Sequence, residues 1–134
     1  MDWYVYHSQK KMGHSYRDLG APIVFSTKVQ RKLCHGHTIW VVEGDLSTPT
    51  SFTIADRFTV KGTDAPSRWG DYAGFKLKVF GNTSLLRAPV PVDTSASWFE
   101  ELHSRFITKQ RFFCSLSEHP SISSGLATAS GVAI

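Results

Sequence analysis

The sequence has few cysteines and no long apolar run, and each shortage excludes a class of protein. Cys34 and Cys114 are the only cysteines among 134 residues, too few for the disulfide framework of a small secreted domain. No stretch approaches the roughly 20 apolar residues that a transmembrane helix needs, and the first residues lack the basic and apolar regions of a secretory signal. The sequence therefore predicts one domain in the cytoplasm, with reduced thiols and no membrane contact.

The signature motifs of the large enzyme classes are also missing. The chain has no phosphate loop, no H-E-x-x-H, no C-x-x-C and no G-x-S-x-G. Cys34, His35 and His37 offer three donor groups within four residues, but adjacent side chains of an extended segment point to opposite faces. Since zinc sites usually need four ligands, we expect no metal here. Because the enzyme motifs are missing, we also expect no cofactor and no catalytic residue.

Acidic residues are fewer than basic ones, which leaves a formal net charge of +4. This excess permits attraction to a polyanion, and solvated surface charge is the alternative interpretation. The basic residues recur in two places, and we expect them to contact phosphates: Lys28, Arg31 and Lys32, then Arg105, Lys109 and Arg111.

Strand patterns outnumber helix patterns along the chain. Within 50–61, Phe52, Ile54, Phe58 and Val60 share one parity, which predicts a strand with a single buried face. One helix is expected after residues 93–95, where serines can cap free amides. The other expected strands are 3–7, 22–26, 37–43, 75–80 and 111–116, with a short extended piece in 85–92.

These patterns predict an α+β fold built on a small curved or barrel-closed, mainly antiparallel sheet, with one helix in the C-terminal half. We expect a single domain over 1–116. Small residues dominate the segment that follows, so 117–134 is expected to be a flexible tail or the start of a linker.

Aromatic residues make up 13% of the chain, including four tryptophans. Trp40 and Trp98 lie on core patterns. Two other groups of rings lie off these patterns, Trp3 with Tyr6 and Trp69 with Tyr72. We expect these rings to meet at the mouth of a pocket. Such rings stack on a flat base, and the alternative is that they seal the two ends of a barrel. Expected polar groups beside the pocket are Ser8, Ser26, Thr27 and Asp71.

Four segments carry a resemblance to a known family: Trp-Tyr-Val-Tyr-His-Ser at 3–8, Ile-Val-Phe-Ser at 23–26, Gly-His-Thr-Ile-Trp-Val-Val-Glu-Gly-Asp at 36–45, and Ser-Trp-Phe-Glu-Glu-Leu at 97–102. With them the chain resembles the PUA superfamily, and within it the EVE-like modules that occur alone or joined to HNH-type nucleases in prokaryotes. The resemblance implies a pseudo-barrel that binds RNA, or a modified DNA base flipped into an aromatic cage. The chain itself has no recognisable HNH set of histidine and asparagine residues, so a nuclease would belong to a partner or to a fused domain.

The combined prediction is a nucleic-acid binding module, a reader of a modified base in a defence or restriction system, with DNA or RNA as its partner. Two alternatives stay open: a small hydrolase of modified nucleosides using Thr27, Lys28 and Glu43, and a protein-interaction domain. The expected base-binding residues are Trp3, Tyr6, His7, Ser8, Ser26, Thr27, Trp69, Asp71 and Tyr72.

Overall fold

The computed structural model describes residues 1–65 and 74–131, and within them the fold is α+β with two mainly antiparallel sheets and three α-helices. The larger sheet has the order β7-β4-β3-β1-β8 and the smaller one β2-β6-β5. Only the pairing of β1 with β3 is parallel among the described strands. The strands are β1 (Asp2–Ser8), β2 (Ile23–Ser26), β3 (Thr38–Gly44), β4 (Phe52–Thr59), β5 (Gly62–Asp64), β6 (Leu77–Phe80), β7 (Val90–Pro91) and β8 (Phe113–Ser115).

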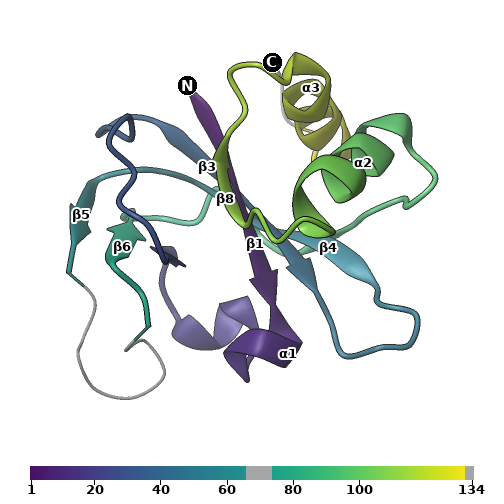
Figure 1. The fold of residues 1–134 in the computed structure, drawn as a ribbon, viewed down its shortest axis with the longest axis horizontal. Helices are drawn as coiled ribbons and strands as arrows, with labels where there is room; N and C mark the ends of the chain where they lie inside the picture. Colours follow the sequence, from purple (N-terminus) through teal and green to yellow (C-terminus); the bar gives the residue numbers. More distant parts are fainter. Residues whose placement is uncertain (66–73, 132–134) are drawn as a thin grey trace.

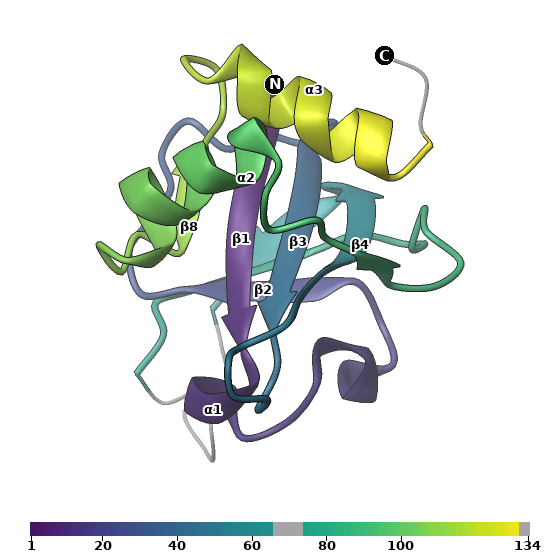
Figure 2. The same cartoon turned by 90° about the vertical axis from the view of Figure 1, so that its right-hand side faces the viewer.

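Helices α2 (Ser97–Leu102) and α3 (Pro120–Ala129) lie on one face of the larger sheet, and the smaller sheet lies on the other. In Figure 1, β5 and β6 are on one side of β1, whereas α2 and α3 are on the opposite side; Figure 2 shows α2 and α3 in front of β1 and β3. The helical segments are α1 (Gln9–Met12), the 3-10 helix η1 (Tyr16–Leu19), α2 (Ser97–Leu102), the π-helical turn η3 (His103–Ile107) and α3 (Pro120–Ala129). The larger sheet is therefore the middle of three layers.

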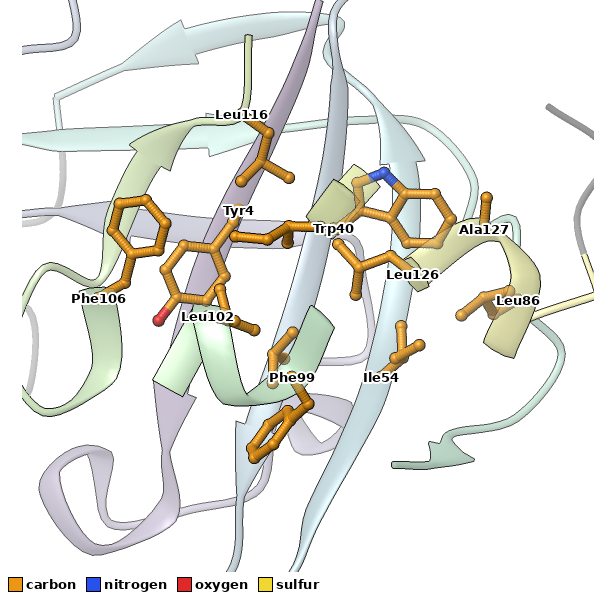
Figure 3. Packing of buried hydrophobic residues seen from close by; sticks show 12 residues of the cluster. Tyr4, Trp40, Ile54, Leu86, Phe99, Leu102, Phe106, Leu116, Leu126 and Ala127 are labelled. Carbon is orange, nitrogen blue, oxygen red and sulfur yellow. The ribbon is translucent and has the colours of Figure 1, made fainter. Parts of the chain in front are cut away.

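Each face of the larger sheet has its own hydrophobic core. The helix-side core joins Tyr4 and Trp40 of the sheet to Leu102 of α2 and Leu126 of α3 (Figure 3). The inter-sheet core joins Trp3, Val5, Ile39 and Val41 to the smaller sheet. Because β3 is buried on both faces, it has a continuous apolar sequence instead of an alternating one.

A β-bulge in β4 moves its side chains from one core to the other. Val42 pairs with Ile54 but Val41 pairs with Asp56, so Ala55 is the extra residue. Ile54 belongs to the helix-side core, whereas Phe58 belongs to the inter-sheet core. The prediction of one buried face for 50–61 is therefore wrong, because a bulge shifts the two-residue period by one position.

The chain passes from one sheet to the other between Val60 and Lys61. The amide of Val60 donates to the carbonyl of His37 at 2.7 Å, and the amide of Lys61 donates to that of Phe80 in β6 at 2.9 Å. This corner joins the sheets at one side. At the opposite side β2 and β8 are edge strands that do not pair among the described residues, so no closed barrel forms there.

The segment after residue 116 is not a tail. Residues 120–129 form α3, in which Ile122 and Leu126 are fully buried in the helix-side core. Gly125 lets this helix lie directly against the indole of Trp98. The expected flexible tail over 117–134 is therefore wrong over 120–129, and the expected single helix becomes α2 with α3 beside it and α1 near the N-terminus.

Candidate nucleotide-binding cavity

A cavity of about 370 Å³ opens where the two sheets are not joined. Its walls come from the end of β1, from β2 with the residues that follow it, and from the segment 110–114 that contains β8. The volume lies within the range of small-molecule sites, roughly 300–1,000 Å³. The missing closure between β2 and β8 therefore provides a binding-sized opening.

Phenylalanine rings line the cavity from both sides. Phe25 and Phe75 lie on the side of the smaller sheet, with ring centroids 5.6 Å apart, and Phe112 and Phe113 lie on the side of β8. The ring of Tyr6 lies 5.2 Å from that of Phe112. The sequence patterns predict these phenylalanines only as strand residues; the Phe112–Phe113 pair directly after Arg111 is the signal that would have drawn attention to them.

The fully charged side chains among the described residues of the cavity wall are both cations. Lys28 and Arg111 line it, and none of the described lining residues is an aspartate or a glutamate. Lys11 adds a third positive charge nearby, because its ammonium group lies 4.6 Å from the centre of the Phe112 ring. This combination of aromatic surface and unpaired positive charge favours a planar anionic ligand.

His7 is the buried titratable residue of the cavity. It is 6% exposed, and its Nε2–H donates to the carbonyl of His14 at 2.8 Å, with the Glu43 carboxylate 3.6 Å away. Burial lowers the pKa of His7, and the hydrogen bond to His14 and the charge of Glu43 oppose that shift only in part. The ring is therefore neutral near pH 7.

A buried polar network supports this end of β1. The amide of Tyr16 donates to the carboxylate of Glu43, and its hydroxyl donates to Asp56 at 2.7 Å. Asp56 is fully buried and also accepts from the Ser84 hydroxyl at 2.8 Å. Burial, followed by the hydrogen bond to Asp56, raises the pKa of Tyr16. Tyr16 thus connects two buried carboxylates, an arrangement that no pattern in the sequence indicates.

The hydroxyl of Ser26 lines the cavity but is fully used by the protein. It donates to the carbonyl of Lys28 at 2.6 Å and accepts from the Lys28 amide and from Nε2 of Gln30. A hydroxyl has one proton and two lone pairs, so Ser26 holds the loop that carries Lys28.

The backbone of Gln110 is left-handed at the cavity wall, with φ of 57°. It ends the helical segment in a Schellman-like arrangement, with the Arg111 amide donating to the carbonyl of Phe106 at 2.9 Å. Glycine is the residue that usually takes this position. The side chain of glutamine is therefore kept here at a conformational cost.

The structure brings together part of the predicted base-binding set. Tyr6, His7, Ser26 and Thr27 line the cavity, whereas Ser8 caps α1 by accepting from the Lys11 amide. Trp69, Asp71 and Tyr72 lie outside the described residues.

Trp3 does not lie beside Tyr6 in a shared cage. Its indole is 3% exposed within the inter-sheet core, and its N–H donates to Nδ1 of His37 at 3.0 Å. Tyr6 packs against the helix-side core instead. The two rings are three positions apart on one strand and so project to opposite faces.

Among the predicted phosphate contacts, only Lys28 and Arg111 line the cavity. Arg105 lies on η3, where its side chain pairs with Glu101 at 3.7 Å. The remaining three are exposed at positions outside the cavity wall: Arg31, Lys32 and Lys109.

Two other predicted arrangements can be placed. Nδ1 of His37 accepts hydrogen bonds from Trp3 and from the Cys34 amide, and no group of three or more potential metal ligands occurs among the described residues. Thr27 and Lys28 line the cavity but Glu43 does not, so the hydrolase trio is not assembled around one space.

Comparison with protein-family models, curated proteins and solved structures found no match to the chain. Within residues 1–65 and 74–131, no helix has the length and apolar character needed to cross a membrane. The resemblance to the PUA superfamily therefore stays a prediction, and the cavity between the two sheets is the main guide to function.

Proposed function

We propose that the protein binds nucleic acid by holding one base in the cavity between β2 and β8. The observation that carries this proposal is the lining of the cavity. It has phenylalanines on both sides and the cations Lys28 and Arg111, and its described residues include no aspartate or glutamate. A nucleotide combines the flat apolar face of its base with a phosphate at a short distance, so it can use the rings and the cations of such a site at once.

The two parts of the lining have separate energetic roles. Stacking on an aromatic ring contributes about 1–3 kcal/mol per base and tolerates any base. Contacts from lysine and arginine to phosphates release counterions, so they add affinity that falls steeply as salt rises. An apolar protein interface lacks that salt dependence, which distinguishes nucleic-acid binding from the protein-interaction alternative.

The resemblance to the PUA superfamily supports the same proposal. It implies a pseudo-barrel with its base site beside the first strand, and the cavity lies at the end of β1, next to His7. On this proposal the fold is an open pseudo-barrel whose gap admits a base flipped out of a strand. A modified base of DNA or RNA is then the preferred ligand.

The first experiment compares two lysines of one segment. Lys28 lines the cavity, and Lys32, four residues later, is equally exposed but does not. Binding of a fluorescent single-stranded oligonucleotide is titrated at several salt concentrations. We expect Lys28→Ala to weaken binding and to reduce the salt slope by about 1, and Lys32→Ala to leave both near the wild-type values.

A second comparison tests the rings. Phe75→Leu removes an aromatic face from the cavity, whereas Phe80→Leu removes one from β6 outside the cavity wall. We expect only the first to lower the affinity, by about tenfold. If the wild-type protein binds no oligonucleotide, or if each pair of variants behaves alike, the proposal is wrong.

A further inference from the structure

Resting on the proposed function, we propose that His7 selects ligands with an N–H group, because its Nδ1 accepts a hydrogen bond from the edge of the bound base. The ligand class is then an anionic nucleotide whose base carries an exocyclic amine or a ring N–H. His7 acts as a specificity-determining residue on this view, and the phenylalanines and cations supply affinity that any base can use.

The tautomer of His7 follows from its partners. A carbonyl oxygen can only accept, so the contact of Nε2 with the His14 carbonyl fixes the proton on Nε2. In a neutral ring Nδ1 then carries a lone pair. Nδ1 has no hydrogen-bond partner within the described part of the chain. It also differs from the unpartnered atoms that are fully buried, such as Nε2 of His14, because it keeps some accessible surface. Because His7 lines the cavity and its Nδ1 is neither bonded nor sealed from solvent, we infer that a ligand in the cavity can reach this lone pair.

The other buried polar side chain of the described lining, Ser26, cannot replace this acceptor. Ser26 is saturated by Lys28 and Gln30, and the cations Lys28 and Arg111 only donate. The carboxylate of Glu43 stands behind His7 and is engaged by the Tyr16 amide. Of the two buried polar side chains in the described lining, His7 is thus the one whose acceptor is not already engaged, and two neighbours hold it in position.

The test uses pairs of nucleoside monophosphates in which one member lacks one N–H donor of the other. Three pairs remove an exocyclic amine, in the monophosphates of adenosine with purine riboside, cytidine with 2-pyrimidinone riboside, and guanosine with inosine. The fourth replaces a ring N–H by N–CH3, in the monophosphates of uridine with N3-methyluridine. Each affinity is measured by calorimetry or by ligand-observed NMR. We expect at least one pair to favour the N–H form by about tenfold, the effect of one good hydrogen bond. Equal affinities within every pair would overturn the inference and leave base binding itself intact.

The pH dependence of the ratio tests whether the acceptor is an imidazole. A proton on Nδ1 removes the lone pair, so the preference should weaken as the pH falls below the usual histidine range, and burial moves this loss to lower pH by lowering the pKa of His7. Titration of the phosphate cancels, because both members of a pair carry it. Among the described residues, the titratable and charged groups that face His7 are Glu43, His14, Tyr16 and Asp18, and Lys28, Arg111 and Cys114 lie elsewhere in the cavity wall.

Two variants complete the design. His7→Phe keeps a ring but no acceptor, and it should remove the preference for the N–H form. His14→Gln keeps the backbone carbonyl that holds His7, so the preference and its pH dependence should both survive. Loss of the preference in His14→Gln, or its persistence at low pH in the wild type, would assign the selection to another group. A wild-type protein that binds none of the nucleotides would instead refute the proposed function.

Discussion

Replacing Gly125 by alanine tests whether α3 packs on the sheet as described. In an ordinary helix this change is favourable by about 1 kcal/mol, since glycine is a poor helix former. Here the new Cβ would lie 2.5 Å from Cδ1 and Cδ2 of the Trp98 indole and closer still to Cγ. Carbon atoms pack at about 3.5–4.0 Å, so the indole must retreat by roughly 1 Å or more. The atoms in contact are at the base of the ring, where rotation about χ2 gives little relief.

The expected net effect follows from these two contributions. Overpacking costs about 1–3 kcal/mol, which exceeds the gain in helix propensity, so Gly125→Ala should lower the free energy of unfolding by about 1 kcal/mol. In a Trp98→Ala background the obstacle is gone, and the same change should raise it by about 1 kcal/mol. The sign reversal corresponds to a coupling energy of about 2 kcal/mol.

Urea denaturation of the four proteins, followed by circular dichroism, measures this cycle. The two backgrounds must be compared under the same conditions, and the m-value should stay constant if the transition remains two-state. A Gly125→Ala change that stabilises both backgrounds equally would refute the reasoning, because α3 would then have no contact with Trp98.

Three further predictions concern the polar groups. Tyr16→Phe removes a hydrogen-bond donor from the buried Asp56, so we expect the free energy of unfolding to fall by about 1–3 kcal/mol. Tyr4→Phe deletes a buried hydroxyl that has no partner among the described residues, so it should leave the free energy of unfolding equal or higher. Urea denaturation measures both effects. The pKa of His7 is lower in the folded chain than in the unfolded one, so as the pH falls the unfolded state takes up a proton first. The contribution of the neutral His7 to stability is therefore present above about pH 6.5 and declines below it. His7→Gln should make the melting temperature fall less steeply with decreasing pH. Gln110→Gly should raise stability by about 1 kcal/mol in denaturation and weaken nucleotide binding in calorimetric titrations.

Each of these predictions has a clear contrary result. Equal losses from the two tyrosine substitutions would mean that the hydroxyl of Tyr16 is not the group that matters. His35→Gln, at an exposed position, is the control for the pH series, and an unchanged profile in His7→Gln would assign the decline to another residue. A Gln110→Gly variant that is more stable and binds nucleotide normally would show that the glutamine side chain does not touch the ligand.

Strands with strong apolar patterns could be predicted from the sequence, and their partners could not. The patterns at 3–7, 22–26 and 37–43 agree with β1, β2 and β3 to within about one residue at each end. The parallel pairing of β1 with β3 depends on contacts between distant segments, which no local pattern encodes. For the same reason the sequence left open whether the sheet is curved or closed into a barrel, since the pairing of β2 with β8 would be a contact between distant segments.

The candidate site was predicted in part, and its largest error could have been avoided. His7 and Thr27 are predicted as base-binding residues and Lys28 as a phosphate contact, and all three line the cavity. Trp3 and Tyr6 were expected to meet, although an odd spacing along a strand sends them to opposite faces. Bulk alone suggested a shared cage, and the alternation of the strand was the better guide.

Helix α3 was missed because its sequence is weakly apolar. Only Ile122 and Leu126 carry large buried side chains, four residues apart, and the neighbouring residues are small. Their spacing is the helical signal, and Pro120 at the first turn is a normal start. Gly125, one of the small residues that make this segment resemble a linker, allows the helix to approach Trp98 closely.

The strands that serve both cores have a consequence for how the protein loses its structure. Strand β4 contributes Ile54 to the helix-side core and Phe58 to the inter-sheet core, so a loss of packing in one core displaces a strand on which the other depends. Damage on either side is shared through the same backbone. The two halves should accordingly melt together, in one cooperative step, rather than as separable units.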